Sequence, residues 1–348
     1  MWIKGLATLR ADKSPPSAMK NGRSEDAFAT LDARWILALA SRTFTPDALP
    51  MPQAHATRIH DVLAHQAGAR PDAVCLYEEG GGTVTYGQLW QQARHAAQWL
   101  AGQGVRPGHR VLMVGENCRA MLVSMFACGI VGAWPVGVNA RLSPREIAAI
   151  RAHAQPALSL YTSGISGAAQ GHADDAEAQD ADPEVWGPGL RMAVASAPTE
   201  PETGPLAAEV ATVIYTSGTT GAPKGVITTH ASLMHNAELI GQTMRVPEGA
   251  EYLSYIPLSW ATEQWVGVTM GLMRPLRVSF AEQPDQIQEA IRELACEIVF
   301  FGPRQWESLA ARVHARMLDA APWRQKVVDW GLRIGRLARA DQLDTRAR

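Results

Sequence analysis

The chain has 348 residues, of which 47% are hydrophobic and 19% are charged, and its formal net charge is −2 at pH 7. This composition supplies enough apolar side chains for a sizeable core, which excludes wholesale disorder, and the near-neutral charge argues against a nucleic-acid partner. The four cysteines form no C-x-x-C pair, and the ten histidines form no H-E-x-x-H motif or Cys/His cluster. We therefore expect a cytoplasmic protein with reduced thiols, and the sequence alone reveals no metal site.

The chain divides near residue 56. Residues 1–55 are polar, carry scattered proline and serine, and form an extension that we cannot assign. Its apolar run at 35–40 is too short for the hydrophobic part of a signal peptide. From 56 to 348 strand-like and helix-like segments alternate, which predicts an α/β domain with mainly parallel sheets flanked by helices.

Two helix-start signals stand in the first part of this domain. Thr85 to Gln88 and Ser143 to Glu146 have the capping-box pattern, and Pro144 places proline at the first helical position. We expect strands at 73–77, 83–85, 111–114 and 134–138, and helices from 86 to about 103, at 119–131 and from 144 onward.

Residues 120–140 contain no charged side chain, and this length could span a bilayer. Gly129, Gly132, Pro135 and Gly137 interrupt the stretch, and a strand-like segment precedes it. A buried helix that passes into a buried strand explains it better than a membrane span. A membrane protein built on this segment is the least favoured functional class.

Residues 165–207 are dominated by Ala, Asp, Gly, Pro and Glu, which predicts a long surface loop. Beyond it we expect strands at 210–215, 252–256 and 297–301, and helices at about 231–244, 285–295, 303–318 and 323–338. Seven Lys/Arg and three Asp lie between 324 and 348. A solvated helix face is the preferred interpretation there, and peripheral contact with an anionic membrane is the alternative.

A loop rich in glycine and hydroxyl groups follows the strand expected at 210–215. Glycines let successive backbone N–H groups converge on an anion, hydroxyls donate to phosphate oxygens, and a lysine adds a mobile positive charge. Pro223 precedes the lysine, where a Walker loop has glycine. An incidental surface loop is the alternative to phosphate binding. The predicted phosphate-binding residues are Thr216, Ser217, Gly218, Thr219, Thr220, Gly221, Lys224 and Gly225.

Residues 215–226 resemble the phosphate-loop signature of the adenylate-forming superfamily, which includes acyl-CoA synthetases, luciferases and peptide-synthetase adenylation domains. Segments similar to the opening of such enzymes are 85–108, 114–117, 132–136 and 139–142. The resemblance covers about 56–340 and implies the AMP-binding N-terminal domain of the acyl-CoA synthetase/luciferase-like fold. That domain is expected to be incomplete, because nothing after residue 301 resembles the family's Tyr-Gly-x-Thr-Glu segment, ribose-binding aspartate or small C-terminal domain.

The resemblance implies a two-step reaction with ATP, Mg²⁺ and coenzyme A. A carboxylate attacks the α-phosphate of ATP to give acyl-AMP and pyrophosphate, and the thiolate of coenzyme A then attacks the acyl carbon and releases AMP. Lys224 and Thr216 are the candidate catalytic residues, because charge accumulates on phosphate oxygens. Since later motifs are missing, we expect poor solubility and no complete ligation by this chain alone. A nucleotide-binding remnant that serves as an interaction module is the second functional class.

Residues 252–260 resemble the family's next motif, which delivers a side chain to the acid-binding pocket. The resemblance places Trp260 at a position where many relatives have histidine. Tryptophan packs against an acyl chain but cannot accept a proton, and a core tryptophan is the alternative. Glu263 is expected to form an ion pair, and direct participation in catalysis is the less favoured alternative. Segments 280–282 and 298–307 and the helices after them resemble the long-chain branch of the family. A long-chain fatty acid is therefore the expected substrate, with another carboxylic acid as the alternative.

A second copy of the phosphate motif lies upstream. Tyr161 to Gly167 repeat five of the seven residues from Tyr215 to Gly221. The copy continues with Ala-Ala-Gln, without proline or lysine. A loop without its cation would hold a triphosphate poorly, so we interpret this copy as the end of a strand without a phosphate-binding function.

Overall fold

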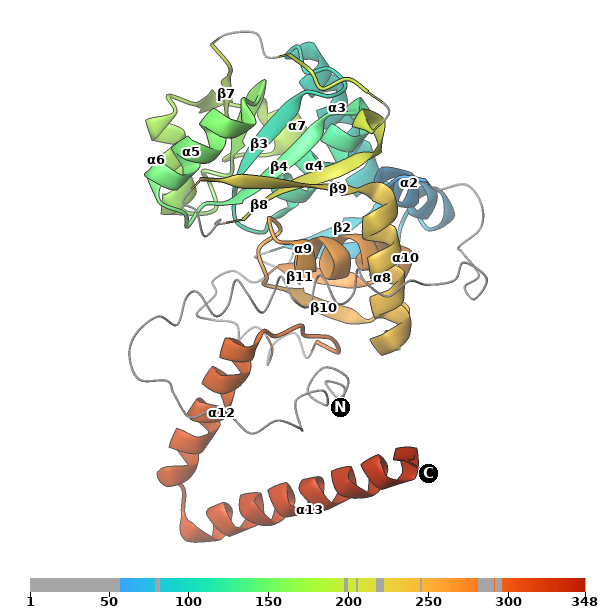
Figure 1. Ribbon diagram of the computed structural model, residues 1–348, viewed down its shortest axis with the longest axis vertical. Coiled ribbons are helices and arrows are strands. Elements are labelled where there is room, and N and C mark those ends of the chain that lie inside the picture. Colours follow the sequence, from blue (N-terminus) through green and yellow to red (C-terminus); the bar gives the residue numbers. More distant parts are fainter. Residues whose placement is uncertain are drawn as a thin grey trace. The chain divides into compact units, whose positions relative to one another are not determined.

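The computed structural model describes residues 57–78, 82–196, 200–204, 206–216, 222–244, 246–280, 291 and 296–347, except for the side chains of 335–347. The chain forms two compact units, Met1–Val299 and Phe300–Arg348. Both β-sheets lie in the first unit, as do all the described residues of the predicted site (Figure 1).

A seven-stranded sheet with the order β6-β7-β5-β3-β4-β8-β9 forms the centre of the first unit. Its four central strands are parallel, and its outer pairs are antiparallel. The parallel arrangement expected from the alternating strands and helices is thus confirmed in the middle of the sheet. The strands are β3 (Arg110–Gly115), β4 (Trp134–Asn139), β5 (Leu158–Tyr161), β6 (Gln179–Asp180), β7 (Arg191–Val194), β8 (Val210–Thr216) and β9 (Lys224–Thr229).

Helices cover both faces of this sheet. Alternate residues of β3 and β4, such as Leu112 and Val136, pack into a core with α5 (Pro144–Ala154) and α6 (Gly167–Asp175). The opposite face packs against α4 (Arg119–Val131), which in turn lies against α3 (Tyr86–Gly102). Burial on both faces explains why the central strands are continuous apolar runs.

The second sheet has the order β10-β11-β1-β2, with β1 and β10 parallel to β11. Its strands are β1 (Val74–Tyr77), β2 (Thr83–Thr85), β10 (Glu251–Ser254) and β11 (Arg277–Phe280). The helical segments packed around it and between the sheets are α2 (Ile59–Ala69), α8 (His230–Met244), α9 (Ala261–Glu263), the π-helix η5 (Gln264–Met270) and α10 (Gly271–Met273). The run from α9 to α10 and strand β11 were not predicted.

Both capping boxes are confirmed. The Thr85 hydroxyl accepts the Gln88 N–H at 3.3 Å, and the Gln88 side chain accepts the Thr85 N–H at 2.9 Å. Ser143 and Glu146 form the same pair of bonds at 3.3 and 2.8 Å. The Ser143 hydroxyl and N–H lower the pKa of the Glu146 carboxyl by stabilising its charged form. These local bonds explain why the starts of α3 and α5 are readable in the sequence.

The uncharged stretch 120–140 is a buried helix followed by a buried strand, as predicted. Helix α4 is buried from Met121 to Gly129, and it ends at Gly132 in the left-handed conformation with φ of 81°. Strand β4 then crosses the sheet centre. None of the described helices combines the length and hydrophobicity that a bilayer crossing requires.

The prediction of a long loop over 165–207 was wrong. The segment contains α6, β6, α7 (Pro183–Trp186), β7 and the 3₁₀ turn η4 (Ala207–Glu209), and β7 pairs with β5. Ala169 and Ala173 are buried four residues apart, a helical spacing that the Ala- and Asp-rich composition obscures. The strand predicted for 297–301 is reduced to one bridge between Tyr252 and Ile298. The helix predicted for 285–295 lies, apart from residue 291, outside the described residues.

The second unit consists of two helices, α12 (Pro303–Leu318) and α13 (Pro322–Ala347). Each begins with proline at its first position, which explains the confirmed start of α12 and the break near 322. No residue of α12 is buried.

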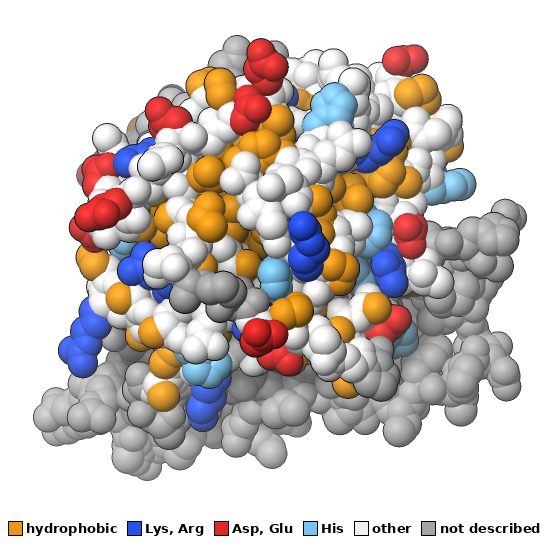
Figure 2. Space-filling model, turned by 90° about the horizontal axis from the view of Figure 1, so that it is seen from above, with side chains coloured by type: hydrophobic (Ala, Val, Ile, Leu, Met, Phe, Trp, Pro, Cys, Tyr) orange, Lys and Arg blue, Asp and Glu red, His pale blue; other side chains and the backbone are white. Residues whose placement is uncertain are grey.

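On the face of the molecule in Figure 2, acidic and basic side chains are interspersed with hydrophobic ones, so that face carries no large patch of one sign.

Candidate functional site

The predicted phosphate loop connects the two strands of a hairpin. Strands β8 and β9 are antiparallel, and Thr216 at the end of β8 pairs with Lys224 at the start of β9. Residues 217–221 lie outside the described residues, so the prediction for Ser217, Gly218, Thr219, Thr220 and Gly221 stays a prediction. The sequence analysis missed β9 and expected a helix soon after the loop. That helix, α8, begins only at His230.

Thr216 and Lys224 are both exposed at the loop end of this hairpin. Parallel strands β3, β4, β5 and β8 all end at this edge of the sheet, and ligands of open α/β sheets bind at the carboxyl ends of the strands. The Lys224 side chain forms no ion pair or hydrogen bond with any residue that the structure describes. Its ammonium group therefore remains available for an anion.

Gly225 has a packing role that the sequence analysis did not identify. It pairs with Tyr215, and a Cβ atom at residue 225 would lie 2.9 Å from Val213 Cγ1 and 3.3 Å from Tyr215 Cζ. These distances are shorter than normal contacts, so a side chain here would push β9 away from β8. Glycine thus keeps Lys224 close to Thr216.

A hydrogen bond fixes Tyr215, the residue before Thr216, to helix α5. The Tyr215 hydroxyl and His153 Nδ1 are 2.7 Å apart, and their rings meet edge to face at 5.7 Å. Partial burial raises the pKa of Tyr215, so its phenol stays protonated near neutral pH. No sequence signal distinguished His153 as a partner, because the contact joins residues 62 positions apart.

The second motif copy takes a different path at the same sheet edge. After β5 the chain turns and enters α6, whose N-cap is Ser166. The Ser166 hydroxyl donates to Glu116 Oε2 at 2.8 Å, and the Ser163 hydroxyl donates to the Gly189 carbonyl at 3.1 Å. Two hydroxyls are therefore already bonded, and a carboxylate lies where an anion would approach the helix start.

Trp260 is 49% exposed, so the alternative of a core tryptophan is wrong. It is the N-cap residue of α9, and its N–H donates to the Pro257 carbonyl at 2.8 Å. The ring is thus presented to solvent on a short turn between β10 and α9. A side chain in this position is free to contact a ligand.

Glu263 is completely buried, and the expectation of an ion pair is wrong. The Tyr252 hydroxyl donates to Glu263 Oε2 at 2.7 Å, and no described cation lies within ion-pair distance. Burial raises the pKa of this carboxyl to about 7. A Cβ atom at Gly267 would lie 2.0 Å from Glu263 Oε1, so glycine in the π-helix leaves the room that the carboxyl occupies.

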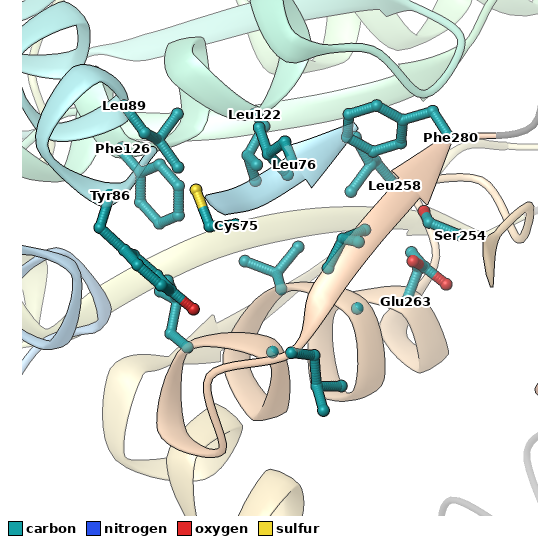
Figure 3. Close-up of a pocket in the computed structure, with 16 residues that line it drawn as sticks. Cys75, Leu76, Tyr86, Leu89, Leu122, Phe126, Ser254, Leu258, Glu263 and Phe280 are labelled. Atoms are coloured by element: carbon teal, nitrogen blue, oxygen red, sulfur yellow. The ribbon is translucent and has the colours of Figure 1, made fainter. Parts of the chain in front are cut away.

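Glu263 also lines a small apolar cavity between the second sheet, α3, α4 and η5. Ser254 and Glu263 lie at one end of it, and Tyr86 and Phe126 lie at the other (Figure 3). The cavity volume is about 20 Å³, which admits one water-sized molecule but no acyl chain. Among the residues that the structure describes, no group of three or more His, Cys, Asp or Glu could hold a metal ion.

Known proteins resemble this chain in sequence and in fold. The AMP-binding enzyme family matches residues 63–334, and the chain therefore belongs to this family. A feruloyl-CoA synthase from Amycolatopsis sp. is 29% identical over 262 residues, which cover 74% of this chain and 51% of the relative. The chain thus spans about half the length of that relative.

Two further relatives indicate the breadth of the family. The long-chain-fatty-acid–CoA ligase ACSBG2 of Gallus gallus is 32% identical over 132 residues, which cover 36% of this chain and 17% of the relative. The solved structure of o-succinylbenzoate CoA synthetase from Bacillus subtilis, in complex with its acyl-adenylate intermediate, superposes with a TM-score of 0.57 at 22% identity. That match covers 72% of this chain and 64% of the solved one, and it supports the fold alone.

Proposed function

We propose that this chain provides the ATP-binding part of an AMP-forming acid–CoA ligase. A carboxylate would attack the α-phosphate of ATP, releasing pyrophosphate and forming acyl-AMP. The thiolate of coenzyme A would then attack the acyl carbon and release AMP. The observation that carries the proposal is the pairing of Thr216 with Lys224 across a glycine- and hydroxyl-rich connection, at the carboxyl edge of a parallel sheet in a member of the AMP-binding family.

In this proposal Lys224 neutralises charge on the β- and γ-phosphates, and the Thr216 hydroxyl donates to the same group. Both side chains are exposed at the loop end of one hairpin, so a single polyphosphate can reach both. Ser217, Thr219 and Thr220 would add hydroxyl donors, and Gly218 and Gly221 would let the backbone approach. Mg²⁺ would bind with the nucleotide and supply further charge neutralisation on the phosphate oxygens.

Two classes of acid are supported by different observations. Helices α12 and α13 resemble the long-chain branch, and one relative is a long-chain-fatty-acid–CoA ligase. The longer match to a feruloyl-CoA synthase and the exposed Trp260 ring favour a planar aromatic acid, because aromatic rings stack on one another. We propose a long-chain fatty acid and an aromatic acid as the two candidate substrates.

The test combines ATP binding with ATP–pyrophosphate exchange, using palmitate and ferulate as the acids. The unmodified chain is expected to bind Mg-ATP, and Lys224→Ala is expected to weaken that binding about hundredfold, since a charge-assisted contact to phosphate is lost. Lys326→Ala, on α13, is the matched control. Equal ATP affinity in the Lys224→Ala and unmodified chains would overturn the proposal.

The exchange measurement separates the remaining functional classes. Acid-dependent exchange identifies an adenylating domain, and its dependence on palmitate or ferulate selects the acid. ATP binding without exchange, with either acid, would instead support a nucleotide-binding module that works through another protein.

A further inference from the structure

The segment that carries Trp260 is fastened to the seven-stranded sheet by one amide side chain. Asn117 follows the end of β3, and its Nδ2 donates to Ser254 Oγ at 3.0 Å and to the Ile256 carbonyl at 2.7 Å. Its Oδ1 accepts the Leu258 N–H at 2.7 Å. The three bonds reach residues about 140 positions away in sequence, and they connect the end of β10 to the other sheet.

A glycine of the neighbouring strand completes this attachment. Gly137 lies in β4, and a Cβ atom there would lie 3.3 Å from Ser259 Cα and 3.6 Å from Ser259 Cβ. The backbone of the segment therefore rests directly on the backbone of β4. Asn117 holds the segment by hydrogen bonds, and Gly137 sets its height above the sheet.

Hydrogen bonds within the segment add to these two contacts. Trp260 donates its N–H to the Pro257 carbonyl at 2.8 Å, and its own carbonyl accepts the Gln264 N–H at 3.2 Å. The Gln264 side chain donates to the Leu258 carbonyl. Through Gln264, Trp260 is thus linked to Leu258, which Asn117 holds.

The attachment also has a fixed relation to the phosphate-loop hairpin. Gly137 is in register with Ile214 of β8. Thr216 lies two residues later, which is about 7 Å along an extended strand. Ser259 therefore rests one strand away from β8, close to the end that carries Thr216 and Lys224.

We propose that Asn117 and Gly137 are positioning residues that set the location of Trp260 relative to the phosphate-loop hairpin, and thereby the placing of the carboxylic acid beside ATP. The effect on the acid rests on the proposed function, whereas the attachment of the segment does not. Neither residue touches the reacting atoms in this proposal. They act through residues 254–260.

The attachment is tested by hydrogen–deuterium exchange in the unmodified chain and in Asn117→Ala, Asn117→Asp and Gly137→Ala variants. Asn117→Asp keeps the size and the acceptor of the side chain but loses both N–H donors, so it serves if the alanine variant fails to fold. Asn236→Ala is the matched control, because among the described residues the Asn236 side chain bonds only to Ser232, within α8.

In both Asn117 variants, peptides covering 254–264 are expected to exchange at least tenfold faster, while peptides from β3 and β8 stay unchanged. Gly137→Ala should give a smaller, roughly threefold, increase in the same peptides, because a shift of a few tenths of an ångström relieves the contact. Unchanged exchange in 254–264 in a folded Asn117 variant would overturn the attachment.

The second measurement is the steady-state kinetics of ATP–pyrophosphate exchange. It uses whichever acid, palmitate or ferulate, supports the faster reaction. We expect Asn117→Asp to raise KM for the acid at least fivefold and to change KM for ATP less than twofold. Equal increases in both constants, or none, would overturn the positioning role. If the unmodified chain shows no ATP–pyrophosphate exchange with either acid, the proposed function fails. The hydrogen–deuterium exchange result still decides whether Asn117 holds the segment.

Discussion

The two copies of the Tyr-Thr-Ser-Gly sequence, at 161–164 and 215–218, come after parallel strands of the same sheet and then enter different structures. Tyr215 belongs to the β8–β9 hairpin, with Thr216 and Lys224 exposed at its loop end. After Tyr161 the chain turns into helix α6. Identical residues at the start of each motif thus do not decide whether the chain next forms a hairpin or a helix.

The difference lies in what the neighbours supply. Thr162 is buried, and a Cβ atom at Gly115 would lie 2.2 Å from its hydroxyl oxygen, so this threonine fills the space above a glycine of β3. Gly164 approaches Gly189 so closely that a Cβ atom on it would lie 2.8 Å from Gly189 Cα. The threonine of the upstream copy is therefore enclosed by tertiary packing, whereas Thr216 and Lys224 of the downstream copy are exposed.

The largest predicted change in the free energy of unfolding concerns His230, the first residue of α8, directly after the hairpin. Its Nδ1 accepts the Ile59 N–H at 3.3 Å, and burial lowers its pKa to about 4, helped by the neighbouring His60. Since the folded pKa lies below the usual 6.5, the unfolded state binds more protons, and stability is lost as pH falls from 6.5 towards 4. The loss is about 3 kcal/mol.

The measurement is the difference in unfolding free energy between the unmodified chain and His230→Gln at pH 7 and pH 4.5. Glu263 has a raised pKa and contributes the opposite slope, with stability lost as pH rises from 4.5 towards 7, but it is common to both proteins and cancels. A difference that does not change with pH would contradict the prediction. After correction for the slower intrinsic exchange at low pH, a loss of hydrogen-exchange protection is expected in β9 and not in α6.

A lysine placed in the upstream copy is not expected to create an ATP-binding site there. Gln170 stands at the position equivalent to Lys224. The double variant Lys224→Ala/Gln170→Lys is expected to bind ATP about hundredfold more weakly than the unmodified chain, because the Glu116 carboxylate beside Ser166 repels phosphate and the hydroxyls there are occupied. Recovery of ATP affinity, measured by titration calorimetry, would show that the cation alone distinguishes the two copies.

Glycine-to-alanine substitutions should change the free energy of unfolding in opposite directions in the two copies. In β9, Gly225→Ala creates a 2.9 Å contact with Val213 Cγ1 and should lower the free energy of unfolding by about 1 to 3 kcal/mol. In α6, Gly171→Ala meets nothing within 4 Å and should raise it by about 0.5 to 1 kcal/mol. Chemical denaturation measures both, and a stabilising Gly225→Ala would contradict the packing role.

The slightest difference is expected between the two tyrosines. Tyr215→Phe removes the hydrogen bond to His153 and should cost about 1 kcal/mol. The buried Tyr161 hydroxyl has no hydrogen-bond partner among the described residues, so Tyr161→Phe should be neutral or stabilising. Thermal unfolding of the two variants side by side provides the comparison, and an equal loss in both would remove the distinction.

The amino-acid sequence was sufficient for the features that depend on near neighbours. The capping boxes at Thr85 and Ser143 join residues three positions apart, and the starts of α3 and α5 result from them. The bounds of α4 were predicted correctly because its apolar length and the closing Gly132 are written along one stretch. The motif at 215–226 also pointed to the family, since its composition needs no partner to be recognised.

Only the tertiary structure shows which residues from distant parts of the chain contact one another. The bonds from Asn117 to Ser254 and Leu258 span about 140 residues, and no local periodicity encodes them. Likewise, Glu263 lost its expected ion pair because its surroundings are Tyr252 and Gly267 rather than a cation. Burial, pairing and accessibility depend on contacts between distant segments, and such contacts are formed by the packed chain rather than by any single stretch of it.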